Sequence, residues 1–137
     1  RVRALDGGTL GLALLSHIRS SDDLILLDAV RGAGPPGTFI RLEGDEVVPA
    51  VRTRLSCHQV GVGDLLDALH MLDAYPQRLV LLGLVPKTLE LGLCRSPPVE
   101  EQLPMLVEKT VEEARRLGHQ LLPSAGDETA KELGLWP

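Results

Sequence analysis

Aromatic side chains are almost missing from this sequence: its 137 residues include one Phe, one Tyr and one Trp. The core must therefore be built from Leu, Val, Ile and Ala. The shortage also argues against binding of single-stranded nucleic acid, because such proteins stack the bases on aromatic rings. Acidic residues also outnumber basic ones, by 19 to 14. The net charge of −5 gives no electrostatic reason to expect a nucleic-acid partner.

Long hydrophobic runs and paired cysteines are also lacking. No apolar run approaches the roughly 20 residues that span a bilayer, so we predict no membrane association. The two cysteines, Cys57 and Cys94, are far apart in sequence. They indicate free thiols in a reducing compartment rather than a disulfide framework, and we expect a cytoplasmic protein.

Short apolar runs alternate with stretches of helical periodicity. The runs predict strands at residues 24–30, 38–42 and 78–85, with the end of another strand at 2–5. Residues 24–30 have the continuous apolar character of a central strand that is buried on both faces. The helical pattern covers residues 10–18, 59–72 and 97–118, while 43–56 is ambiguous and 119–137 reads as a loosely held tail. The pattern predicts a single α/β domain over 1–137, a three-layer sandwich with a largely parallel, twisted sheet flanked by helices.

Two residues are candidates for chemistry. Asp28 ends a buried apolar strand, where open α/β sheets bind their ligands and where an uncompensated charge is costly. The alternative is that Asp28 only accepts hydrogen bonds from the loop at 31–34. His58 lies where a loop gives way to a helix, accessible to a metal such as nickel or zinc. A lone histidine is nonetheless more often structural.

Other motifs give little. Cys57 could offer a thiolate, but a small buried residue is the simpler interpretation. His17, His70 and His119 have spacings that form no ligand pair. No Gly-x-Ser-x-Gly elbow, phosphate-binding loop or His-Glu-x-x-His motif is present. The candidate chemistry therefore rests on Asp28 and His58.

Over roughly residues 1 to 117 the chain resembles the hydrogenase maturation endopeptidases. Each motif alone is weak, but their order along the chain is specific. The motifs that carry the resemblance are Leu5-Asp6-Gly7-Gly8-Thr9-Leu10-Gly11, Leu26-Leu27-Asp28-Ala29-Val30, Gly34-Pro35-Pro36-Gly37-Thr38, Ser56-Cys57-His58-Gln59-Val60-Gly61, Val80-Leu81-Leu82-Gly83-Leu84-Val85-Pro86, Leu89-Glu90-Leu91-Gly92-Leu93 and Ser96-Pro97-Pro98-Val99.

This resemblance implies an aspartic-type endopeptidase that removes the C-terminal extension of a nickel–iron hydrogenase large-subunit precursor after nickel insertion. Asp28 and His58 would be the catalytic and metal-ligating residues, together with a Glu from an N-terminal Gly-rich segment. Asp6, Gly7, Gly8 and Thr9 would bind the substrate. The nickel would arrive with the substrate, so no permanently bound cofactor is expected.

The family's first strand and its Glu ligand would precede Arg1, so the chain reads as N-terminally truncated. We expect these residues alone to be poorly active, which a hydrolysis assay would test. Two other functions stay open. One is a non-catalytic α/β binding module, in which Asp28 and His58 serve structure. The other is a protease of related fold that cuts a different protein irrespective of nickel.

Overall fold

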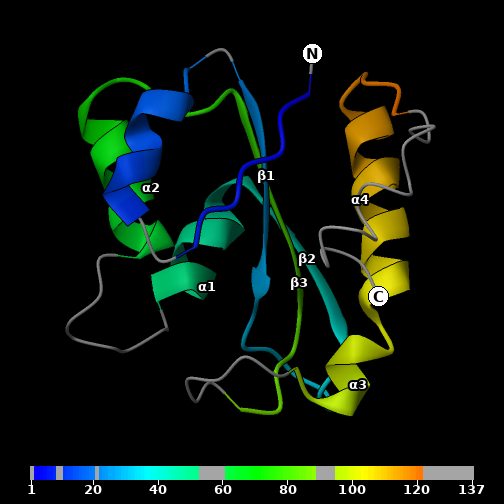
Figure 1. The fold of residues 1–137 in the computed structure, drawn as a ribbon. Coiled ribbons are helices and arrows are strands. Elements are labelled where there is room, and N and C mark those ends of the chain that lie inside the picture. The colour runs from blue at the N-terminus through cyan, green and yellow to red at the C-terminus, as the bar shows by residue number, and fades with distance from the viewer. Residues whose placement is uncertain (1, 9–10, 21, 53–60, 89–94, 122–137) are drawn as a thin grey trace.

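The protein forms three layers, with a sheet between two groups of helices (Figure 1). The computed structural model describes residues 2–8, 11–20, 22–52, 61–88 and 95–121. One side of the sheet carries the 3-10 helix η1 (Gly11–His17) and the helices α1 (Val47–Arg52) and α2 (Val62–Met71). The long helix α4 (Leu103–Arg116) covers the other side, with the short α3 (Pro97–Glu100) leading into it. The predicted α/β class is confirmed.

The sheet has the strand order β1-β3-β2 in the described part of the chain. The central strand is β3 (Arg78–Leu84), which pairs in parallel with β1 (Asp23–Ala29) and antiparallel with β2 (Phe39–Glu43). The sheet of the described residues is thus mixed. The prediction of a central strand at 24–30 was wrong for this sheet: β1 lies at an edge and Leu27 is 54% exposed.

One face of the sheet packs an aliphatic core under α1 and α2. Strand alternation sends Leu79 and Leu81 of β3 to this face, where they meet Leu65, Leu66 and Leu69. These three leucines follow the i, i+1, i+4 spacing that places side chains on one side of a helix. The ambiguous stretch 43–56 contributes η2 (Gly44–Glu46) and α1. Pro49 is tolerated in the first turn of α1, because an N–H there has no intrahelical partner.

On the opposite face, two helices, α3 and α4, are present where a single helix was predicted at 97–118. The helix is interrupted between Glu100 and Leu103. Pro104 explains the break, since it lacks the N–H needed to continue the ladder but suits the first turn of a new helix. Glu113 lies among the charged residues of this helix, yet it is only 4% exposed.

Two other predictions on the N-terminal part were wrong. Residues 2–5 form no strand, and Val2 and Leu5 remain about half exposed at 48% and 50%. They pair with no strand among the described residues, and an unpaired segment cannot form a ladder. The helix predicted at 10–18 is a 3-10 helix instead, a conformation common in short segments.

A backbone hydrogen bond holds the C-terminal end of α4 in place. The His119 N–H donates to the Ala114 carbonyl over 2.9 Å, which closes the helix. Most of the predicted loose tail, residues 122–137, lies outside the described residues. Among the described residues, no helix is long and apolar enough to cross a membrane.

Candidate functional site

The carboxyl ends of β1 and β3 meet at one edge of the sheet, because the two strands are parallel. This edge lies at the bottom of Figure 1, where the loop from β1 to β2 and the start of α3 also gather. Three backbone bonds hold it. Val30 N–H donates to Leu84 O over 3.0 Å, Gly37 N–H to Val85 O over 2.8 Å, and Val85 N–H to Thr38 O over 2.9 Å. These hydrogen bonds fix the backbone at this edge, and with it the positions from which the side chains extend.

Asp28 lies at this edge, as predicted for a ligand-binding position in an open α/β sheet. Its carboxylate is partly buried, and Oδ1 accepts the N–H of Ala29 over 2.7 Å. Alternation puts Asp28 on the same face as Leu26 and Val30, which belong to the core beside α1 and α2. The Ala29 N–H that binds Oδ1 is not one of the loop donors at 31–34 that the structural alternative invoked, and that alternative stays open.

A turn is present at residues 6–8, which are three of the four residues predicted to bind the substrate. The Gly8 N–H donates to Asp6 Oδ1 over 2.9 Å, which is the hydrogen bond of an Asx turn. Asp6 and Gly8 are exposed and Gly7 is half-buried, packed toward Leu14 of η1. Thr9, the fourth predicted residue, lies outside the described residues. An exposed turn of this kind can contact a peptide through its backbone groups.

His58 also lies outside the described residues, as do both cysteines. The described residues on either side are informative. The chain leaves α1 at Arg52 and enters α2 after Gly61, whose N–H donates to Asp64 Oδ2 over 2.8 Å. Within the described ranges no three potential ligands gather into a metal site. The structure thus places Asp28 and the 6–8 turn, and the Asp28–His58 pair stays a prediction.

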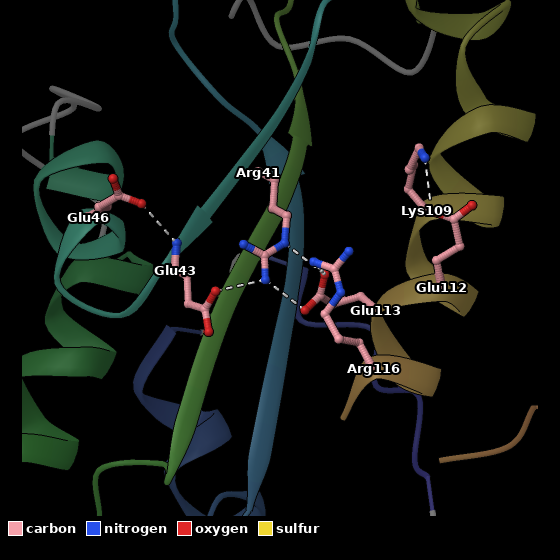
Figure 2. Close-up of polar contacts among 7 residues, drawn as sticks. All are labelled: Arg41, Glu43, Glu46, Lys109, Glu112, Glu113 and Arg116. Carbon is pink, nitrogen blue, oxygen red and sulfur yellow. Dashed lines mark hydrogen bonds and ion pairs between the residues drawn. The ribbon is translucent and has the colours of Figure 1, made fainter. Parts of the chain in front are cut away.

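A charged cluster on the α4 side of the sheet was not predicted (Figure 2). Arg41 of β2 donates to both carboxylate oxygens of Glu113 over 2.8 Å, and also to Glu43 over 2.8 Å. Arg116 approaches Glu113 at 3.5 Å. The Arg41 hydrogen bonds hold the pKa of the buried Glu113 carboxyl below its usual value, against the opposing effect of burial. Because both Glu113 oxygens are bonded to Arg41, this cluster joins α4 to the sheet.

A second ion pair holds the opposite end of the sheet. Arg78 donates to both oxygens of Asp23 over 2.8 and 2.7 Å, and Arg78 also reaches the Leu117 carbonyl at the end of α4. The hydrogen bonds from Arg78 lower the pKa of the Asp23 carboxyl. These residues lie at the amino ends of β1 and β3, away from Asp28. Neither ion pair is therefore part of the candidate site.

A shallow depression of about 460 Å³ lies beside the carboxyl edge, on the side that α4 covers. Its lining includes Phe39, Pro98, Glu101, Gln102 and Met105. Asp28 lies on the opposite face by strand alternation, so the depression and the candidate carboxylate do not form one pocket.

Sequence reasoning missed Gly83, the residue paired with Asp28 in the β1–β3 register. A glycine inside a buried apolar strand is itself a signal of close backbone approach. By contrast, nothing in the sequence pattern marks the Arg41–Glu113 pair, because its members are 72 residues apart.

A scan against family models matches residues 1–113 to the model described as hydrogenase maturation protease. Among curated relatives, the hydrogenase 2 maturation protease of Escherichia coli is 35% identical over 123 residues, which are 89% of this chain and 75% of the relative. The hydrogenase expression/formation protein HupD of Thiocapsa roseopersicina is 36% identical over 119 residues, or 85% of this chain and 54% of that protein. The chain thus spans three quarters of one of these relatives and about half of the other.

Solved structures give the same result. The hydrogenase maturating endopeptidase HybD from E. coli has a TM-score of 0.78 and 34% identity, covering 88% of this chain and 75% of that one. A [NiFe] hydrogenase maturation protease HybD from Thermococcus kodakarensis has a TM-score of 0.61 and 25% identity, with 80% of this chain and 77% of that one covered.

Proposed function

The chain belongs to the hydrogenase maturation protease family, and we propose that it is an endopeptidase that removes the C-terminal extension of a nickel–iron hydrogenase large-subunit precursor. The resemblance predicted from the motifs is confirmed at the level of the family. The observation that carries the proposal is the match over residues 1–113, which includes Asp28, His58 and the 6–8 turn. Relatives with solved structures are named as endopeptidases or proteases that act in hydrogenase maturation.

The position of Asp28 supports a role in engaging the substrate's metal. A partly buried carboxylate at the carboxyl edge of parallel strands lies where this class of sheet binds ligands. The bond from Ala29 N–H fixes one carboxylate oxygen and so limits rotation of the side chain. His58 falls in sequence between α1 and α2, the two helices that cover the face on which Asp28 lies.

In this proposal Asp28 and His58 engage nickel that the precursor already holds. A carboxylate and an imidazole suit a borderline divalent metal that keeps other ligands on its carrier. The exposed turn at Asp6, Gly7 and Gly8, with Thr9 following it, contacts the peptide near the bond to be cut. Hydrolysis breaks the peptide C–N bond and adds water across it. We further propose an aspartic-type enzyme that acts in the cytoplasm and carries no metal between turnovers.

The test is the intact mass of a nickel-loaded large-subunit precursor after incubation with the full-length gene product that contains these residues. We expect loss of one C-terminal peptide. His58→Ala and Asp28→Asn should each abolish the cleavage. His17→Ala is a matched control, because His17 is an exposed histidine on η1. A nickel-free precursor serves as the second control and should remain intact.

Each outcome separates the proposal from its alternatives. Cleavage of the nickel-free precursor at the same rate would favour a protease whose substrate recognition does not use nickel. An unchanged mass across a panel of precursors, with a correctly folded protein, would contradict the endopeptidase and favour a binding module. Cleavage that survives both Asp28→Asn and His58→Ala would show that the enzyme assignment is right and these site residues are wrong.

A further inference from the structure

Gly83 lies directly opposite Asp28 in the sheet, and its surroundings leave no room for a side chain. In the β1–β3 register, Asp28 pairs with Gly83. A Cβ atom placed on Gly83 would approach both the Asp28 carbonyl oxygen and Val30 Cγ2 more closely than the 3.0 Å that real Cβ atoms keep. The first of these two neighbours is backbone and cannot rotate away. Any side chain at position 83 must therefore shift the backbone of Asp28 or of residue 83 itself, and must also move the Val30 side chain.

The backbone remains paired with β3 on both sides of this contact. Val30 is 2% exposed and its N–H donates to Leu84 O over 3.0 Å, so the chain stays bound to β3 beyond the last residue of β1. Successive N–H groups of a strand point to opposite sides, which turns the Ala29 N–H away from β3. That N–H is the donor to Asp28 Oδ1. The Asp28 carboxylate is thus oriented by backbone that rests on Gly83.

Gly83 is an exception among the buried residues of β3, because the others all carry large aliphatic side chains. Leu79, Val80, Leu81, Leu82 and Leu84 all carry side chains and are at most 4% exposed. Gly83 interrupts this aliphatic series at the register position that pairs with Asp28. A glycine inside a strand weakens the strand, so its presence needs a local reason. The close approach of the Asp28 backbone supplies that reason.

We propose that Gly83 is a positioning residue for the reaction: its missing side chain lets Asp28 hold its carboxylate where the nickel-bearing substrate meets the carboxyl edge of the sheet. The inference rests on the proposed function, because it assigns Asp28 to substrate engagement. Gly83 itself touches no reacting atom. Its effect is transmitted through the backbone of β1.

The experiment compares Gly83→Ala with Val80→Ala in the full-length protein. Val80 is buried on the same strand but pairs with Ile25, three register positions from Asp28. Val80→Ala therefore controls for loss of stability without contact to the site. The measurements are kcat and KM for precursor cleavage, and the Ala29 amide resonance in a ¹⁵N-labelled sample. If Gly83→Ala does not fold, Gly83→Ala/Val30→Ala replaces it, since it removes the Val30 Cγ2 contact and keeps the one to Asp28.

We expect Gly83→Ala to shift the Ala29 amide and to lower kcat by about 10- to 100-fold with little change in KM, the range that misplacement of a reacting group by about 1 Å produces. Val80→Ala should leave both readouts near the wild-type values. If Gly83→Ala shifts the Ala29 amide but leaves kcat unchanged, the inference about Gly83 is wrong while the proposed function stands. An Ala29 amide that does not shift in Gly83→Ala would have the same meaning. If the wild-type protein cleaves no precursor, the proposed function is wrong. The role of Gly83 in the reaction then falls as well, because it rests on that function.

Discussion

Both faces of the sheet bury aliphatic side chains, but only one of them also buries an ion pair among the described residues. On the α1 and α2 side, Leu65, Leu66 and Leu69 are at most 1% exposed and pack against aliphatic residues of β3. On the α4 side, the polar residue Glu113 is only 4% exposed and is bonded through both its oxygens to Arg41 (Figure 2). Apolar packing is non-directional and nearly independent of pH. A buried ion pair depends on geometry, on both partners and on protonation. The stability of the first face should therefore follow side-chain volume, whereas that of the second, which also buries Val80 and Leu82, should depend on charge as well.

Leu66→Ala tests the apolar face and should have the largest effect on stability. Leu66 is 1% exposed, so truncation leaves a cavity as well as losing transfer free energy. We expect a loss of about 3 kcal/mol in the free energy of unfolding, within the usual range of about 2–5 kcal/mol. Urea denaturation monitored by circular dichroism measures it. Leu72→Ala is the matched control, because Leu72 ends the same helix but is 64% exposed. Equal losses in the two variants would contradict the burial described for α2.

Glu113→Gln tests the charged face, with an expected loss of about 2–3 kcal/mol. Removing one partner of a fully buried ion pair costs about 3–5 kcal/mol. The cost is smaller here because the Arg41 side chain is 28% exposed and water can still reach it. The double variant Arg41→Met/Glu113→Leu should recover most of this loss, since replacing both charges by apolar groups removes their desolvation. A double variant less stable than Glu113→Gln would mean that the pair itself is strongly stabilising.

The dependence of stability on pH should also separate the two faces. The folded pKa of Glu113 is lowered by Arg41, so the unfolded chain binds its proton more readily. This contribution is complete above the usual glutamate pKa of 4.5, and it is lost as the pH falls through the lowered value. Arg78 likewise lowers the folded pKa of Asp23, so Asp23 contributes to the pH dependence of stability with the same sign. Urea unfolding at a series of pH values from 7 down to 3 should show wild-type protein losing stability below about pH 4.5.

Glu113→Gln should lose less over that interval than wild type, whereas Leu66→Ala should follow the wild-type slope at a lower stability. If Glu113→Gln and wild type had parallel profiles, the carboxyl would not be the group that titrates on folding.

The same contrast explains which parts of the structure could be predicted from sequence. Periodicity reports only whether a segment has an apolar side, so it located β1, β3, α2 and the start of α3 to within a few residues. It could not identify which strand is central, because that depends on pairing between distant segments, and β1 was wrongly placed at the centre. It also could not indicate that Glu113 is buried, since its partner Arg41 lies on a different element. The position of Asp28 at the carboxyl edge was predictable, because strand ends can be read from an apolar run. Its close contact with Gly83 was not, because register is a tertiary property.

The smallest expected effect comes from Glu112, the residue next to Glu113 on α4. One step along a helix rotates a side chain by about 100°, so Glu112 points to water while Glu113 points to the sheet. Glu112 accepts a hydrogen bond from Lys109 over 2.9 Å, but their side chains are 54% and 43% exposed. Exposed pairs at this spacing contribute about 0.3 kcal/mol and are screened by salt. Glu112→Gln should therefore lower the free energy of unfolding by no more than that amount, and by less still in 1 M NaCl. Glu113→Gln, with the same chemical change one position away, should keep most of its loss in salt, because a buried pair is screened far less. Similar losses for the two variants in urea denaturation would show that charge, and not burial, sets the energy on this face.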